Sequence, residues 1–214
     1  AAQPVSLQLW ACPSAFTGGL LQGVKVAEID CGMLSQDTTI DQTTSAYLPA
    51  GTQPYVMELV LVENDVILSH VSFSQPQHFV LPRLQGEVTL AGDASTATVS
   101  VESIDNPRTA DNISGTLVLE LWSLSSGYTG GAFTGTQLGG AILGVLAGQC
   151  SWPNTRVELP LVTAAAVGEQ LVLMLREWTA DGYLTRDYRH VQLSLPRAEE
   201  ALAPEAPVVL KDDV

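Results

Sequence analysis

The chain has 214 residues, enough for one large domain or two small ones. Apolar residues make up 46% of it and charged residues 15%, which excludes a disordered chain and a coiled coil. With 9 basic and 23 acidic residues, the net charge of −14 would repel nucleic acid and anionic membrane surfaces. No run approaches the ~18 apolar residues of a membrane span.

Short apolar runs between glycines and prolines predict an all-β fold. Val5, Leu7 and Leu9 alternate with polar or aromatic residues, which is the period of a β-strand. An aromatic-Thr-Gly-Gly segment follows, in which glycine can supply a positive φ. In chain order, we expect strands at 5–10, 24–31, 55–63, 67–73, 88–90, 96–102, 117–122, 136–143, 171–177 and 184–195.

The sequence also resembles itself after a shift of 112 residues. Leu-Gln-Leu-Trp at 7–10 then falls on Leu-Glu-Leu-Trp at 119–122, and Phe-Thr-Gly-Gly at 16–19 falls on Tyr-Thr-Gly-Gly at 128–131. These matches are collinear and need no gap, so they indicate an internal duplication.

The similarity continues after small changes in length. Leu-Val-Leu-Val-Glu at 59–63 matches Leu-Met-Leu-Arg-Glu at 173–177, and His-Val-Ser-Phe at 70–73 matches His-Val-Gln-Leu at 190–193. This alignment makes His70 and His190 equivalent strand positions and suggests structural roles for both.

The duplication predicts a first β-sandwich at 1–84, a second at 85–197 and a C-terminal tail at 198–214. The second copy has an upstream strand at 97–104 whose equivalent in the first would fall before residue 1. Because an unpaired sheet edge favours association, we expect an upstream segment, the strand at 87–102 or another molecule to cover it. One candidate strand donor is the extended tail segment that contains Val208, Val209 and Leu210.

This architecture resembles the tandem immunoglobulin-like β-sandwiches of bacterial exported and surface proteins. The resemblance is carried by the repeat length, the spacing of turns and the strand tryptophans Trp10 and Trp122. It implies two antiparallel sandwiches in a protein that is extracellular, exposed on the cell surface or periplasmic. An architectural likeness does not fix a function.

The repeat makes two of the three cysteines informative. Cys12 aligns with Leu124 and Cys31 with Leu143, so both positions change together between the copies. Paired replacement suggests side chains in contact, and we expect a disulfide between Cys12 and Cys31. The alternative is two independent buried thiols.

Cys150 has no counterpart in the first copy and lies in a predicted loop beside Trp152. An odd cysteine in an exported protein can form a bond between molecules. The other interpretation is a partly buried thiol that packs against Trp152.

No pattern in the sequence predicts catalysis or a metal site. The three histidines, His70, His78 and His190, have neither a triad pattern nor a zinc-ligand spacing. A calcium ion between the two copies stays a hypothesis that rests on three acidic clusters, since such residues more often form turns. The clusters lie at 105–106, 111–112 and 212–213.

The sequence therefore favours a non-enzymatic structural or assembly module of a surface complex or filament, acting through a protein partner or self-association. The alternative is a carbohydrate- or ligand-binding module in which Trp178, Tyr183 and Tyr188 form the contact patch. No cofactor is expected on either interpretation.

Overall fold

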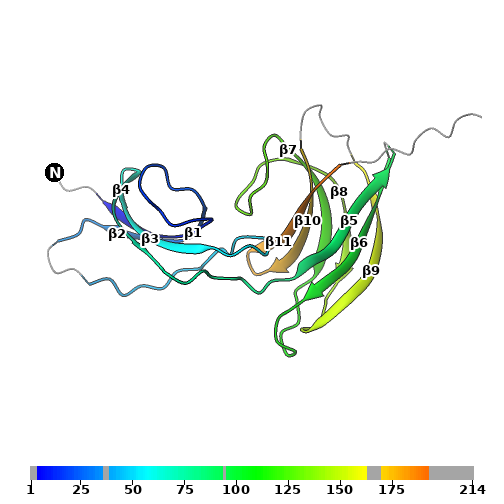
Figure 1. Ribbon diagram of the computed structural model, residues 1–214, viewed down its shortest axis with the longest axis horizontal. Helices are drawn as coiled ribbons and strands as arrows, with labels where there is room; N and C mark the ends of the chain where they lie inside the picture. Colours follow the sequence, from blue (N-terminus) through cyan, green and yellow to red (C-terminus); the bar gives the residue numbers. More distant parts are fainter. Residues whose placement is uncertain (1–3, 36–38, 94, 163–169, 193–214) are drawn as a thin grey trace, which may run out of the picture.

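The computed structural model describes residues 4–35, 39–93, 95–162 and 170–192. Within these ranges the protein contains no helix, and its strands form three antiparallel sheets (Figure 1). The prediction of an all-β fold is confirmed. The tail from 198 and the candidate strand donor Val208–Leu210 lie outside the described residues.

The first half of the chain forms one four-stranded sheet in the order β2-β1-β3-β4. Its strands are β1 (Val5–Cys12), β2 (Val24–Gly32), β3 (Val56–Glu63) and β4 (Val66–Ser72). We call this the first sheet.

The rest of the described chain forms two sheets that face each other (Figure 1). The strands β7 (Leu117–Leu124), β8 (Thr136–Gly144), β10 (Gln170–Thr179) and β11 (Gly182–Val191) form a sheet in the order β11-β10-β7-β8. The strands β5 (Arg83–Gly92), β6 (Thr96–Asn106) and β9 (Cys150–Pro160) form the other, in the order β5-β6-β9. We call them the inner and outer sheets of the sandwich.

Period-two alternation of apolar residues builds the core of the sandwich. Alternate residues of each strand point to the same side, so Leu117, Leu119 and Leu121 of β7 all face the outer sheet. There they pack with residues of β6 such as Val99 and Ile104, and each is almost completely buried. The sandwich holds the larger hydrophobic core of the molecule.

The first sheet and the inner sheet have corresponding strand orders and corresponding registers. Val5 pairs with Gly32 in the first sheet, as Leu117 pairs with Gly144 in the inner sheet. Both β1–β2 and β7–β8 carry register shifts at the same two places. The central pairs also correspond, since Leu9 lies opposite Leu59 and Leu121 lies opposite Leu173.

The register corrects one detail of the alignment. Val60 on β3 lies opposite His70, and the corresponding residue of β10, Met174, lies opposite Tyr188. His70 therefore corresponds to Tyr188 and not to His190. The His70 ring makes an edge contact with Phe16, with centroids 5.1 Å apart. Tyr188 makes the corresponding contact with Tyr128, with centroids 4.6 Å apart.

The sequence pattern missed β9. The sequence predicts a loop at 148–153, which ends at Pro153, and no strand at 154–160. In the structure the strand runs through this segment, with a positive φ at Asn154. Proline is tolerated here because β9 is the edge strand of its sheet, where a missing N–H breaks no ladder on the outer side.

The two halves meet where the segment before β3 contacts the inner sheet. The N–H of Ala50 donates to the carbonyl of Gly130 at 3.0 Å, and the N–H of Gly51 donates to that of Arg186 at 3.0 Å. Ala50 is fully buried against Tyr128 and its neighbours. The first sheet is therefore attached at one end, and the rest of it extends away from the sandwich (Figure 1).

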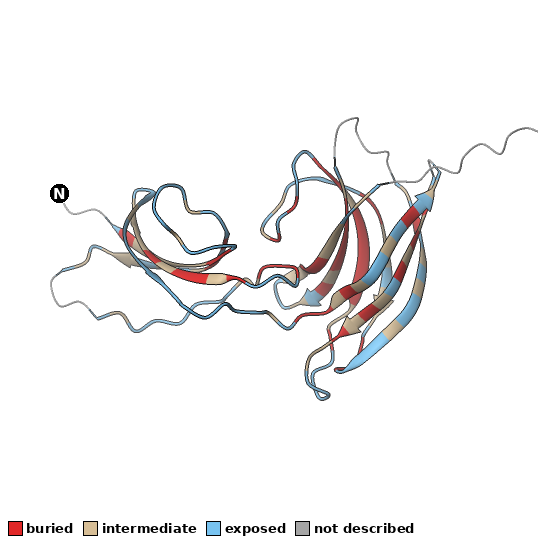
Figure 2. Ribbon diagram, viewed as in Figure 1, coloured by how far each residue is buried: buried red, intermediate tan, exposed pale blue. Residues whose placement is uncertain are grey.

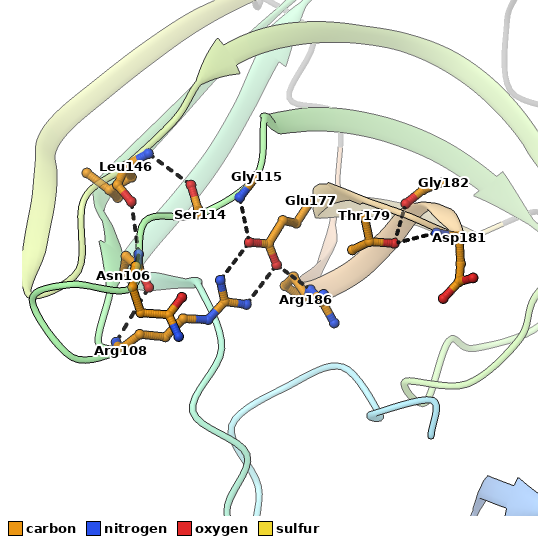
Figure 3. A network of polar contacts seen from close by, with 11 residues as sticks. Asn106, Arg108, Ser114, Gly115, Leu146, Glu177, Thr179, Asp181, Gly182 and Arg186 are labelled. Atoms are coloured by element: carbon orange, nitrogen blue, oxygen red, sulfur yellow. Dashed lines mark hydrogen bonds and ion pairs between the residues drawn. The ribbon is translucent and has the colours of Figure 1, made fainter. Parts of the chain in front are cut away.

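A buried carboxylate holds one end of the sandwich together (Figure 3). Glu177 accepts two hydrogen bonds from Arg108, at 2.6 and 2.7 Å, one from Arg186 at 2.6 Å and one from the N–H of Gly115 at 2.9 Å. Burial alone would raise the pKa of Glu177, but these hydrogen bonds and charges hold it below its usual value. The carboxylate thus ties the loop after β6 to β10 and β11.

We expect Glu177→Gln to lower the free energy of unfolding by about 3 kcal/mol at pH 7, because it leaves the buried Arg186 and the partly buried Arg108 without their counter-charge. Since the folded-state pKa of Glu177 is lowered, its contribution is complete above the unfolded pKa of about 4.3 and is lost as the pH falls through the folded value. Urea unfolding at pH 7 and at pH 3 measures both. If the native chain and Glu177→Gln differ in free energy of unfolding by the same amount at both pH values, the ion-pair account is contradicted.

Candidate functional site

One face of the first sheet carries a row of aliphatic side chains from all four strands. Leu7 lies opposite Ile29 on β2 and Leu61 on β3, and Leu59 lies between Leu9 and Val71. Side chains directly opposite one another point to the same face. We call the face formed by these six residues the open face: Leu7, Leu9, Ile29, Leu59, Leu61 and Val71.

The corresponding face of the inner sheet is the one that packs on the outer sheet. There, the counterparts of Leu7, Leu9, Leu59 and Leu61 are all at most 1% exposed; they are Leu119, Leu121, Leu173 and Leu175. In the first sheet the four leucines are only partly buried, and Val71 is 57% exposed. Figure 2 shows longer buried stretches in the strands of the sandwich than in those of the first sheet. The open face therefore has the side chains of a sandwich interior without a second sheet to cover them.

Two irregular segments, 39–50 and 73–82, pass beneath the first sheet in place of a second sheet (Figure 1). Phe79 packs against the buried cluster that contains Tyr55 and Met57, and so covers the end of the sheet nearest the sandwich. The prediction of two complete sandwiches is therefore not confirmed: the second half has two facing sheets, and the first has one.

The open face is uncharged over most of its area. The positions interspersed among its six residues are alanine, serine, valine or methionine, and Glu63 at the end of β3 is its first ionisable residue. The opposite face has Gln8, Glu58 and His70. A partner for the open face would therefore be recognised by apolar contact.

The edge strand β4 and the residue that follows it add exposed apolar side chains. Val66, Leu68 and Phe73 are 60%, 51% and 47% exposed, in addition to Val71. An edge strand with unpaired backbone groups and exposed apolar side chains favours association.

The opposite face is covered by the loop 13–23, which a buried carboxylate anchors. Glu58 is fully buried and accepts hydrogen bonds from the N–H of Phe16, at 2.9 Å, and from the hydroxyl of Ser72, at 2.8 Å. Burial and the nearby Glu58 charge raise the pKa of the Cys12 thiol to about 11. Cys12 is therefore an inert core residue, as its counterpart Leu124 is.

The expected disulfide between Cys12 and Cys31 is absent, and all three cysteines are free. The register pairs Val5 with Gly32 and Ala11 with Val24, so Cys12 and Cys31 lie at opposite ends of the β1–β2 hairpin. Six residues of strand separate them by about 20 Å. A disulfide needs Cα atoms within about 7 Å. Paired replacement in a repeat therefore did not indicate contact.

The other predicted interaction residues are spread over the sandwich. Cys150 is exposed at the start of β9, whereas Trp152 is partly buried against the main core. Tyr188 packs beside Tyr128 in a smaller cluster on the other face of the inner sheet. These side chains do not form one patch.

Trp178 and Tyr183 do come together. They lie opposite each other on β10 and β11, with ring centroids 5.0 Å apart in an edge contact, and Trp178 is 55% exposed. No three side chains of His, Cys, Asp or Glu come together in the described part of the chain, so the structure adds no support to the calcium hypothesis. Nor do the described residues include a helix long and apolar enough to cross a membrane.

No protein-family model matches this chain, and no curated protein sequence matches it significantly.

Leu61→Ala and Leu175→Ala form a matched pair at corresponding positions. We expect Leu175→Ala to cost about 2–5 kcal/mol, because it empties a closed core. Leu61→Ala should cost less than about half as much, since that side chain already contacts water. Urea unfolding of dilute protein measures both. If the two substitutions lower the free energy of unfolding equally, the open face is covered in solution.

Proposed function

We propose that this chain is a non-enzymatic structural module, exported from the cell, that assembles through the open face of its first sheet. We also propose that the first sheet and the sandwich come from an internal duplication of an immunoglobulin-like unit. The matched strand orders and registers support the duplication. The assembly function rests on one observation, namely that corresponding leucines are buried in the inner sheet and partly exposed in the first.

The occupant that fits the open face is the same face of a second copy. Two sheets pack face to face about 10 Å apart when their facing residues are apolar, as in the sandwich of this chain. A two-fold axis would bring each row of leucines against its symmetry mate and close the dimer. The net charge of −14 opposes association in general, but the open face has no ionisable residue before Glu63.

A carbohydrate-binding role is a second candidate, supported by the exposed indole of Trp178 next to Tyr183. An exposed aromatic ring is a platform on which a sugar ring can stack. Binding of a soluble oligosaccharide should quench tryptophan fluorescence in the native chain and leave that of Trp178→Ala unchanged. No quenching by any member of a glycan panel would exclude this role for those sugars.

Light scattering over a range of protein concentrations tests the assembly proposal. We expect the mass to rise to that of a dimer, and Val71→Asp to keep the chain monomeric by placing a charge on the open face. The control is Ile142→Asp, at a site 75% exposed on β8 that should leave the dimer intact. The same measurements with reductant test whether the exposed Cys150 contributes a bond between molecules.

A monomer at every concentration would contradict self-assembly through this face. Equal effects of Val71→Asp and Ile142→Asp would show that the added charge, and not the face, decides the mass.

A further inference from the structure

The face of the first sheet opposite the open face carries a hollow beneath the loop 13–23. Its volume is about 590 Å³, and its floor is formed by Gln8, Trp10, Val60 and Val62. The loop residues Gly18–Leu21 and the hairpin residues Asp65–His70 form its walls. Neither lysine nor arginine lines it.

The inner sheet has a hollow in the corresponding place, lined by Trp122, Phe133 and Arg176. Two side chains of the protein itself, Phe133 and Arg176, fill this second hollow. Phe133 makes an edge contact with Trp122, with ring centroids 5.0 Å apart. The guanidinium of Arg176 lies 5.9 Å from the Trp122 ring and 5.8 Å from the Phe133 ring.

A carboxylate completes the arrangement of the second hollow. Glu120 accepts a hydrogen bond from the Trp122 indole at 2.8 Å and another from Arg176 at 2.8 Å. The guanidinium is thus held between an aromatic face and a hydrogen-bond acceptor, the usual surroundings of a bound arginine.

The first hollow has a corresponding indole and hydrogen-bond acceptor, but no counterpart of Phe133 or Arg176 from the described chain fills it. The Trp10 indole donates to Gln8 at 2.9 Å, as Trp122 donates to Glu120. By register, however, Val62 stands where Arg176 does. Leu21 takes the place of Phe133 in the corresponding loop. The indole and its acceptor are therefore available to an outside ligand.

We propose that the hollow over Trp10 binds an arginine side chain of a partner protein. The indole face of Trp10 receives the guanidinium, and the side-chain oxygen of Gln8 accepts its N–H groups as Glu120 accepts those of Arg176. Acidic residues favour a cation here: Asp65 lines the hollow, and Glu28 accepts a hydrogen bond from Gln8 at 2.8 Å. Of the neighbouring basic side chains, Lys25 is paired with Glu28, and His70 forms part of the wall.

The experiment uses N-acetyl-arginine amide as the probe and N-acetyl-citrulline amide, its neutral analogue of similar shape, as the control. The readout is the NMR signal of the Trp10 indole N–H, identified by its loss in Trp10→Phe. We expect saturable shifts with a Kd of about 1–10 mM for the arginine probe and at least about tenfold weaker binding of the citrulline probe.

Two variants use the second hollow as a template. Gln8→Glu restores the carboxylate of Glu120 and should tighten arginine binding about three- to tenfold. The double variant Leu21→Phe and Val62→Arg supplies the missing occupants and should abolish binding. Equal binding of the two probes, or unchanged binding by the double variant, would overturn the proposal, as would no shift up to about 50 mM probe.

This site lies on the opposite face from the proposed dimer contact, so the two proposals fail separately. Val71→Asp should leave arginine binding unchanged, and Gln8→Glu should leave the dimer intact.

Discussion

A β-sheet whose strands alternate between apolar and polar residues has one face that must be kept from water. In the sandwich this requirement is met within the chain, because the outer sheet covers Leu119 and Leu173 completely. The corresponding Leu7 and Leu59 are only partly buried, and no second sheet of the described chain covers them. Each of the two sheets has an apolar face, and within the described chain only that of the inner sheet is shielded from water. We therefore assign the proposed partner contact to the open face.

The alternation of apolar residues was enough to predict most strands, since it depends only on neighbouring positions. It failed at β9, because Pro153 indicated a loop and the alternation of apolar residues in this half-exposed edge strand is weak. The sequence alignment also predicted an uncovered sheet edge in the first copy, and this stays a prediction. Which side chains of the first sheet lie partly exposed on one face could be seen only from the register and the burial.

Contacts between distant residues could not be derived in the same way. The paired change of Cys12 and Cys31 to leucine suggested contact, yet the two residues lie at opposite ends of one hairpin. Burial explains the pattern at Cys12, since Cys12 and Leu124 both fill core positions. The hollow over Trp10 was equally hidden: it requires the loop 13–23 to fold back over the sheet, which Glu58 secures by hydrogen bonds.

Glu63 shows how the two corresponding sheets differ. It occupies the position of Glu177 at the end of its strand, but Leu68 stands where Arg186 does, and the described chain has no counterpart of Arg108. Glu63 is only partly buried, and covering a hydrated carboxylate without giving it a new partner costs free energy. A partner that covers the open face up to its rim would have to leave Glu63 hydrated or bring a positive charge to it. The contact is therefore expected to centre on Leu7, Leu59 and Leu61 and to end before β3 does.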